Sequence, residues 1–335
     1  MKKILISVIT CFMLFVFCGY IGTASAAPEK KWRIASVCNL EDPMTIMCQY
    51  FLDALKEISG GKIEVTLFDN GKLGAERETV EQIQSHALEV ASLTGGILAN
   101  FVPEWGFYTL PYLFVNQPQC IAWESTNEAK QLRKYLEKAG LKYLAYEPLL
   151  FRHVMTKKKA LKTSEDMKGV KIRTLENPMF IETYKKMGLS PIPMSFSEVF
   201  TSLETNIIDG YETGVPTFAT TKAYEQLKHL SMTTAFYDVC FLVMDLKLYN
   251  SLSAQEKSWV EKAAAVAIEK EIVLMDKLFN DSLKVLKDNG VTVTYPELEP
   301  MEKKMQPIYA NFYKSYPTLK PFVEKAKSLK NVKKK

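Results

Sequence analysis

The sequence predicts an α/β protein of two lobes with discontinuous domains, connected by a hinge and spanned by one long helix. Strand-like and helix-like segments alternate along the 335 residues, as in a mostly parallel sheet covered on both faces. No Pro-, Gly- or Ser-rich linker divides the chain, although it is long enough for two cores. Residues 253–288 contain neither Pro nor Gly. At ~1.5 Å per residue they predict a helix of roughly 50 Å, longer than one small lobe.

Segments of the first half follow a strand–helix order. The predicted elements are a strand at 32–37, a helix from Pro43 to Gly60-Gly61, a strand at 63–67, a helix at 75–85 and a strand at 89–93. The first helix carries a wide apolar stripe, and two glycines are a typical helix end. Because ligands bind beyond the carboxyl ends of parallel strands, the loops at 38–42, with Asn39, and at 92–96 are expected at a pocket mouth.

The second half also alternates strands and helices, and several of its residues are typical of helix starts. Its predicted elements are extended segments at 141–147 and 151–156, a strand at 170–174, a helix capped by Asn177, a helix opened by Ser195 and Glu198, a strand containing Ile207 and Ile208, a helix from Pro216, and a strand at 291–294. Ser253 and Glu256 form a capping box for the long helix. A kinked pair of shorter helices is the alternative there.

The composition excludes several classes of protein. With 47% hydrophobic and 24% charged residues, the chain is neither disordered nor a polytopic membrane protein. Basic residues exceed acidic ones by only 43 − 38 = 5, too few to indicate nucleic-acid binding. The sequence contains no H-E-x-x-H, G-x-S-x-G or C-x-x-C motif. We therefore expect no metal and no cofactor, and an enzymatic role has no motif in its favour.

The N-terminus has the pattern of a secretory signal peptide. Lys2 and Lys3 precede an apolar run at 4–20, and Ala24-Ser25-Ala26 provides a cleavage site. The alternative, a membrane anchor, is disfavoured because the run is short and ends in that site. Residues 1–26 are thus assigned to a cleaved signal, and the mature protein is expected to be exported.

Four cysteines remain after the predicted cleavage, in a compartment that permits disulfides: Cys38, Cys48, Cys120 and Cys240. Cys38 and Cys48 are close enough in the chain to pair. Their spacing does not decide whether they do.

Arg173 is the first candidate for a binding residue. It follows Ile172 near the end of a predicted strand, directly before the helix start at Asn177-Pro178. A guanidinium beside a helix N-terminus can bind a carboxylate at two points, with support from free backbone N–H groups. Arg152 could add a second positive group. Two solvated arginines are the alternative.

Aromatic residues could wall a pocket beside these arginines, or could simply pack in the core. The candidates are Trp105, Phe196, Tyr211 and Tyr237.

Several short stretches, weak singly but specific in this order, resemble a known family. They are Ser59-Gly60-Gly61-Lys62-Ile63 with Leu73-Gly74, Pro103-Glu104 with Leu110-Pro111-Tyr112-Leu113-Phe114, Phe151-Arg152, residues 166–173, Gly188 with Pro193-Met194, Ser197-Glu198-Val199-Phe200, and Asp209-Gly210-Tyr211-Glu212. The chain resembles the solute-binding proteins of tripartite ATP-independent periplasmic (TRAP) transporters, the DctP family. The resemblance covers nearly the whole mature chain.

The resemblance implies a periplasmic-binding-protein-like fold that closes over an organic acid and delivers it to a small and a large membrane subunit. Arg173 matches the family's carboxylate-binding arginine, Arg152 a second and less uniform arginine, and Phe196 the pocket phenylalanine. Three positions depart from the family's patterns: Thr213 stands where many members have Asn, Thr94 where sialic-acid binders have Glu, and Asp42-Pro43 where His-Pro is usual. A sialic acid is therefore disfavoured, and the aromatic candidates favour a ligand with an apolar body.

The expected domain division follows from this comparison. Lobe I comprises residues 27–150 plus about 239–278, and lobe II comprises 151–238 plus about 279–335. Two other functions remain open. One is a binding protein of another importer or a sensor, and the other is a periplasmic enzyme using Glu212 or His153 as a base.

Overall fold

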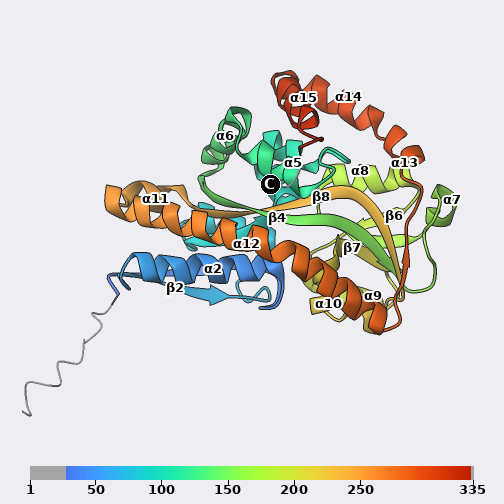
Figure 1. The fold of residues 1–335 in the computed structure, drawn as a ribbon, viewed down its shortest axis with the longest axis horizontal. Coiled ribbons are helices and arrows are strands. Elements are labelled where there is room, and N and C mark those ends of the chain that lie inside the picture. The colour runs from blue at the N-terminus through green and yellow to red at the C-terminus, as the bar shows by residue number, and fades with distance from the viewer. Residues whose placement is uncertain (1–27, 333–335) are drawn as a thin grey trace, which may run out of the picture.

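A mixed sheet forms the centre of the computed structural model, which describes residues 28–332. The predicted signal peptide lies outside these residues. Within the described chain the sheet has nine strands in the order β2-β1-β3-β8-β4-β7-β5-β6, with β9 beside β8. Its two long strands, β4 (Leu141–Thr156) and β8 (His229–Asp245), run through the middle of the molecule (Figure 1). Helices cover both faces, as the fold class predicts.

The remaining strands are shorter, and among the helices α12 (Ala254–Asp288) is much longer than the rest. The other strands are β1 (Lys30–Ala35), β2 (Ile63–Phe68), β3 (Val90–Thr94), β5 (Lys171–Thr174), β6 (Ser190–Pro193), β7 (Gly210–Gly214) and β9 (Thr292–Thr294). The helices are α2 (Pro43–Ile58), α3 (Glu76–Gln84), α4 (Gly95–Phe101), α5 (Gln117–Glu124), α6 (Asn127–Arg133), α7 (Ser164–Met167), α8 (Pro178–Met187), α9 (Val199–Glu204), α10 (Val215–Thr220), α11 (Leu246–Ser251), α12 (Ala254–Asp288), α13 (Glu299–Lys303), α14 (Gln306–Ser315) and α15 (Lys320–Ser328). Short 3₁₀ helices lie at Pro103–Thr109, Lys134–Ala139, Phe196–Glu198, Ala223–Glu225 and Pro317–Leu319.

Strand direction divides the sheet into parallel outer parts and an antiparallel centre. β2, β1 and β3 pair in parallel, and so do β6, β5 and β7. The pairs β3–β8, β8–β4 and β4–β7 are antiparallel. The predicted parallel order is thus correct for both outer parts. The long β4 and β8 cross between them, so the two parts share one sheet.

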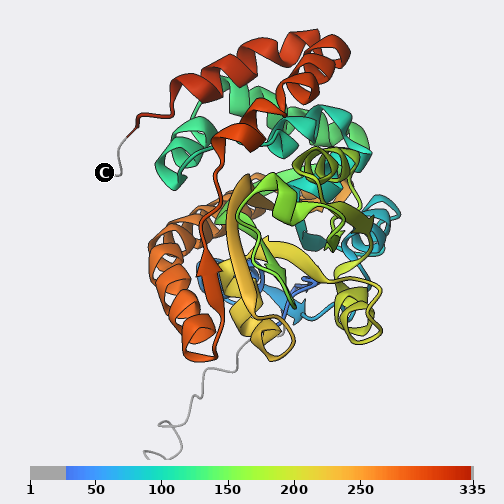
Figure 2. The same cartoon turned by 90° about the vertical axis from the view of Figure 1, so that its right-hand side faces the viewer.

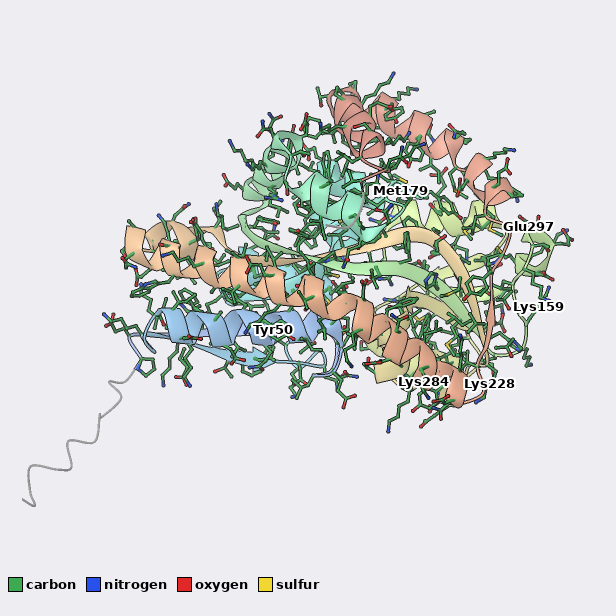
Figure 3. The ribbon with its side chains drawn as sticks, in the orientation of Figure 1. Tyr50, Lys159, Met179, Lys228, Lys284 and Glu297 are labelled. Carbon is green, nitrogen blue, oxygen red and sulfur yellow. The ribbon has the colours of Figure 1, made fainter. Side chains whose placement is uncertain are left out.

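The long helix α12 is continuous over 35 residues, and Ser253 and Glu256 cap its start as predicted. It runs past both outer parts of the sheet (Figure 1). Its first turns pack against α2, and its later apolar residues pack in the cluster around β7 and α10. On the exposed side of the α2 contact, Lys270 lies 5.3 Å from the ring of Tyr50 (Figure 3). The helix therefore joins the two parts of the molecule.

Two strand predictions need correction. The extended segments 141–147 and 151–156 form the single strand β4, whose register with β8 shifts between Pro148 and Leu150. Ile207 and Ile208 do not lie in a strand, because β7 begins only at Gly210. The backbone turns at Asn206, which has a φ of 57°, after α9 ends. This turn delays the strand.

The C-terminal helices α13–α15 pack over one end of the molecule (Figure 2). α15 contacts α5, and α14 contacts α8. The Tyr309 hydroxyl donates to the Pro111 carbonyl at 2.8 Å, and Gln119 Nε2 donates to the Ala326 carbonyl at 2.8 Å. These helices thus touch elements from both halves of the chain.

Membrane insertion has no candidate helix between residues 28 and 332. None of the helices there combines the length and the apolar character that a bilayer span requires.

Gly210 marks a close backbone approach between β7 and β4. A Cβ at this position would lie 2.0 Å from the Met155 carbonyl oxygen. We expect Gly210→Ala to lower the free energy of unfolding by about 2 kcal/mol, because the two strands must separate. Gly106→Ala is the control, since its Cβ would meet Phe312 at 3.5 Å, an ordinary contact. Urea unfolding of both variants checks this, and equal midpoints would contradict it.

Candidate ligand-binding site

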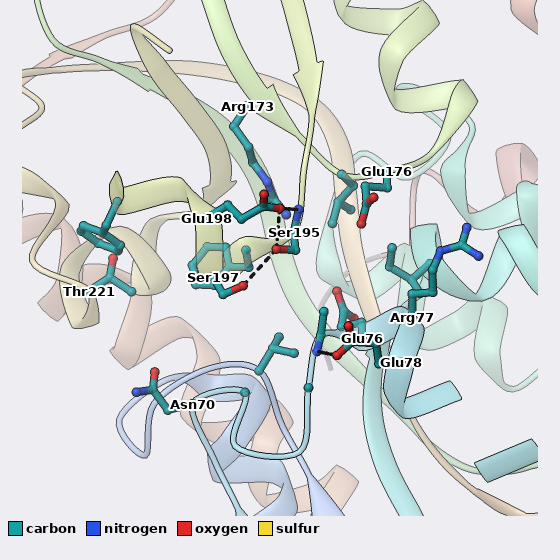
Figure 4. A pocket seen from close by; sticks show the side chains of 18 of the residues that line it. Asn70, Glu76, Arg77, Glu78, Arg173, Glu176, Ser195, Ser197, Glu198 and Thr221 are labelled. Atoms are coloured by element: carbon teal, nitrogen blue, oxygen red, sulfur yellow. Dashed lines mark hydrogen bonds between the residues drawn. The ribbon is translucent and has the colours of Figure 1, made fainter. Parts of the chain in front are cut away.

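A cavity of about 700 Å³ lies among loops that follow the strands. Its walls come from residues 37, 39, 70, 71, 74–78, 97, 173, 175, 176, 195–198, 200 and 221. Arg173 and the Ser195–Glu198 turn stand on one side, and Asn70 and Glu76 on the other (Figure 4). A smaller cavity of about 30 Å³ shares Glu76, Arg173 and Phe196 with it. The predicted pocket-mouth loops therefore contribute to one site.

Arg173 is the buried cation of this site. It lies on β5 between Ile192 of β6 and Tyr211 of β7, and is 2% exposed. Its Nε donates to the Met194 carbonyl at 3.0 Å, and its guanidinium carbon lies 5.5 Å from the Phe196 ring. Among residues 28–332, no carboxylate oxygen lies within 4.0 Å of its nitrogens. Burial lowers its pKa, which Glu212 partly opposes. The site thus contains a desolvated positive charge without a direct counterion.

Arg152 differs because carboxylates surround it. Its Nε lies 2.5 Å from Glu212 Oε2, and its Nη1 lies 2.5 Å from Asp238 Oδ2. Burial alone would lower its pKa, but the two carboxylates raise it well above the ordinary value. The triad carries one net negative charge, which supports Arg173 electrostatically without occupying it. Arg152 also lines the smaller cavity. A direct contact with the ligand remains a prediction.

Glu212 and His153, the two residues considered as a catalytic base, both lie outside the wall of the 700 Å³ cavity. Glu212 accepts further hydrogen bonds from Thr174 Oγ1 at 3.2 Å and the Leu175 N–H at 3.3 Å. His153 lines a different cavity behind β4, and burial lowers its pKa to about 3. Neither side chain lines the 700 Å³ cavity.

Glu76 is a site residue that the sequence reasoning missed. It lies in the first turn of α3, is largely buried, and lines both cavities. It accepts the Thr94 N–H at 2.5 Å and the Thr94 hydroxyl at 3.3 Å. Burial raises its pKa to about 7, opposed by Thr94 and then by the two arginines. Its position after a parallel strand is the signal that could have identified it.

The other predicted site residues fall into two groups. Phe196, Thr94, Thr213 and Asn39 line one or both cavities. Tyr211 lies just behind them, with its ring 6.3 Å from Phe196 and its hydroxyl 3.2 Å from Thr221 Oγ1.

Trp105 and Tyr237 line neither cavity. Trp105 packs edge-on against Phe241 at 4.4 Å and donates to the Leu132 carbonyl at 3.2 Å. Tyr237 packs against Phe114 and Phe151. Both belong to the core, where a large ring buries more apolar area than in a polar cavity wall. Placing them in the pocket wall was wrong.

Metal-ligating side chains and cysteines both occur among residues 28–332. No group of three or more His, Cys, Asp or Glu side chains is arranged to hold a metal there. Cys38 and Cys48 are both free and buried, which answers the pairing question for this structure.

Three asparagine amides connect opposite sides of the cavity region. Asn39 donates to the Thr220 carbonyl at 3.1 Å, Asn100 to the Glu176 carbonyl at 2.7 Å, and Asn177 to the Gly96 carbonyl at 2.7 Å. The same Asn177 side chain caps α8 by accepting the Met179 N–H at 2.8 Å. One residue thus starts a helix and holds two parts of the molecule together.

These two roles of Asn177 can be separated. We expect Asn177→Ala to lower the free energy of unfolding by about 1–2 kcal/mol through the lost cap. Asn177→Ser keeps a cap acceptor, so its free energy of unfolding should stay within ~0.5 kcal/mol of the parent's. Its shorter side chain cannot reach the Gly96 carbonyl. Both variants should bind ligand severalfold more weakly. If the serine variant binds like the parent in calorimetry, the Gly96 contact has no part in binding.

Comparison with known proteins agrees with this architecture. The family described as bacterial extracellular solute-binding protein, family 7 (DctP) matches residues 34–315. A solute-binding protein of Verminephrobacter eiseniae is 30% identical over 300 residues, 88% of each chain. The structure of a TRAP periplasmic solute-binding protein from Roseobacter denitrificans with bound β-D-glucuronate gives a TM-score of 0.86 at 25% identity, covering 89% of this chain and 99% of that one. A counterpart from Haemophilus influenzae with bound L-gulonate gives 0.85 at 28% identity, covering 90% and 99%. The chain therefore belongs to the DctP family of bacterial extracellular solute-binding proteins and has their two-lobed, periplasmic-binding-protein-like fold.

Proposed function

We propose that this protein binds a small hydroxylated organic acid in the periplasm and delivers it to the small and large membrane subunits of a TRAP transporter. The predicted signal peptide at 1–26 would direct its export. The same proposal assigns it binding and release rather than turnover. Family membership supports the class of function, and the site supports the class of ligand.

The buried and unpaired guanidinium of Arg173 is the observation that carries the proposal. A desolvated charge is costly unless it is paired, so the fold keeps Arg173 ready for a ligand carboxylate. The planar fork can make two parallel hydrogen bonds to that carboxylate. Phe196 covers one face of the guanidinium and excludes water, which strengthens the ionic contact.

The remaining cavity wall favours hydroxyl groups on the ligand body. Hydroxyl, amide and carboxylate side chains line it: Asn39, Asn70, Glu76, Ser195, Ser197 and Thr221. Phe196 and Phe200 are the aromatic side chains of this wall. The ligand with an apolar body, which the sequence favoured, is therefore replaced in the proposal by a polyhydroxy acid. Relatives with bound β-D-glucuronate and L-gulonate have ligands of this kind.

Closure of the two lobes is the proposed means of capture. The division into 27–150 plus about 239–278 and 151–238 plus about 279–335 places chain crossings in β4, β8 and α12. Arg173 and Phe196 then face Glu76 and Asn39 from opposite lobes. Because one ligand touches both walls, its binding energy favours the closed form.

Calorimetry with a matched panel tests the ligand class. D-glucuronate, D-galacturonate and L-gulonate are the acids, and D-glucose is the neutral control of similar size. We expect at least one acid to bind and D-glucose to show no binding. Equal affinity for D-glucose, or a neutral or cationic molecule that co-purifies with the protein by mass spectrometry, would contradict the proposal.

A further inference from the structure

Two buried carboxyl groups lie outside the ligand site. Glu147 on β4 and Glu271 on α12 are both 0% exposed. The Ser92 hydroxyl donates to Glu147 Oε1 at 2.8 Å, but Glu147 Oε2 and both Glu271 oxygens have no hydrogen-bond partner. Within residues 28–332, no basic nitrogen lies within 4.0 Å of either carboxyl group. Buried polar atoms without partners are uncommon and costly, so this pair requires an explanation.

The pair lies where the chain crosses from one half of the molecule to the other. Before Glu271, α12 packs Val260, Ala263, Ala264 and Ala267 into the cluster with α2 and β1. After it, Leu286 packs into the cluster with β7 and α10, with Phe279 and Leu283 against it. Glu147 directly precedes the register shift between Pro148 and Leu150 in β4. Glu271 and Glu147 therefore both lie just before the points where α12 and β4 cross from one half of the molecule to the other.

The surroundings of the pair contain more acid than base. The titratable and charged groups around it are Asp42, Cys48 and Tyr50 at α2, Lys270 on α12, and Asp238 and Cys240 on β8. Lys270 is exposed and lies over Tyr50, and Asp238 is paired with Arg152. Burial and then Asp42 raise the pKa of Glu271 to about 8. Burial and then Glu271 raise the pKa of Glu147 well above its ordinary value.

We propose that Glu147 and Glu271 form a proton-held joint between α12 and β4, on the lobe I side of the points where both elements cross between the lobes. When both carboxyl groups are protonated, α12 packs against β4 and α2 without a buried charge. Loss of a proton places an unpaired negative charge in the joint, which loosens this packing and favours the open form of the protein. The effect on ligand rests on the proposed function, whereas the effect on packing does not.

The direction of the pH dependence follows from linkage. Glu271 titrates near 8 in the folded protein and near its ordinary 4.5 when unfolded. Between these values the folded protein binds more protons, so its stability falls as pH rises through this window and levels off above about pH 8.

Thermal unfolding between pH 5 and 9 tests the joint with Glu271→Gln, Glu147→Gln and a matched control. The control is Glu269→Gln, an exposed carboxyl on the same helix. We expect Glu271→Gln to melt about 5 °C above the parent at pH 9 and within 1 °C of it at pH 5. Glu269→Gln should follow the parent throughout. Equal pH profiles for the parent and Glu271→Gln would overturn the proposal.

Two further measurements cover the remaining outcomes. If Glu271→Gln does not fold, hydrogen exchange of the parent decides. After correction for intrinsic rates, α12 amides must become less protected from pH 6 to pH 9 relative to α8, and unchanged protection overturns the joint.

For the ligand part, D-glucuronate affinity should fall about tenfold more between pH 6 and 9 in the parent than in Glu271→Gln. Both proteins contain Glu76, so any effect of its titration on affinity is the same in both and cancels in the comparison. An equal fall overturns the coupling to ligand even where the melting result holds.

Discussion

Replacing Arg173 with lysine is expected to weaken carboxylate binding by about tenfold or more. The ammonium group is a point charge and cannot make the planar two-point contact of a guanidinium. Arg173→Met should weaken binding by roughly a hundredfold or more, because it removes a charge-assisted contact from a water-excluded site. Calorimetry with the tightest acid of the panel measures both losses. D-glucose, the neutral control, should show no binding to the parent or to either variant.

The stability of these variants distinguishes a binding role from a structural one. Arg173 is buried without a carboxylate partner, and burial lowers its pKa. Replacing such a charge with an apolar side chain of similar volume is often neutral or stabilising by ~1–4 kcal/mol. We therefore expect ligand-free Arg173→Met to unfold at or above the parent's denaturant midpoint. Arg33→Lys, which lines neither cavity and whose arginine pairs with Glu89 at 2.8 Å, is the control and should bind the acid as the parent does. Unchanged affinity in Arg173→Lys would remove Arg173 from the site.

Local signals explain why much of the fold could be predicted. Asn177 caps α8, Ser253 and Glu256 cap α12, and Pro43 opens α2, and each signal acts within a few residues. The strand end that carries Arg173 is defined in the same way, by the helix start after it. Helix starts and strand ends that depend on such neighbouring residues can be predicted from the sequence alone.

The missing parts of the site depend on contacts between distant residues. Arg152 meets Glu212 and Asp238, which lie 60 and 86 residues farther along the chain. Their meeting depends on the register of β4 with β7 and β8, which shifts beside Arg152, and the sequence does not record such shifts. The prediction that Trp105 and Tyr237 wall the pocket failed for another reason. Aromatic residues have the same sequence pattern in a core and in a pocket wall.

The second large effect is expected on stability, from Arg152→Met. Removing this arginine leaves Glu212 and Asp238 as buried carboxylates without their cation, and breaking a buried pair in this way costs about 3–5 kcal/mol. Burial already raises the pKa of Asp238, while Arg152 lowers it. Without Arg152 that pKa must rise further, so the variant's deficit should grow as pH rises from its ordinary value of 3.8. Urea unfolding at pH 5 and pH 8 measures both effects.

Neutralising the stranded carboxylates provides the decisive comparison. In Arg152→Met/Glu212→Gln/Asp238→Asn none of the three charges of the triad remains, so most of the stability lost in Arg152→Met should return and the pH dependence of that loss should disappear. Lys284→Met, which removes the exposed ion pair with Asp288, should cost no more than ~0.5 kcal/mol. If the triple variant is as unstable as Arg152→Met, the cost arises from lost packing around the guanidinium stem, and the triad's charge balance does not hold the fold. If it recovers, the carboxylates of the triad hold Arg152 as their own cation, which leaves Arg173 as the cation available to the ligand.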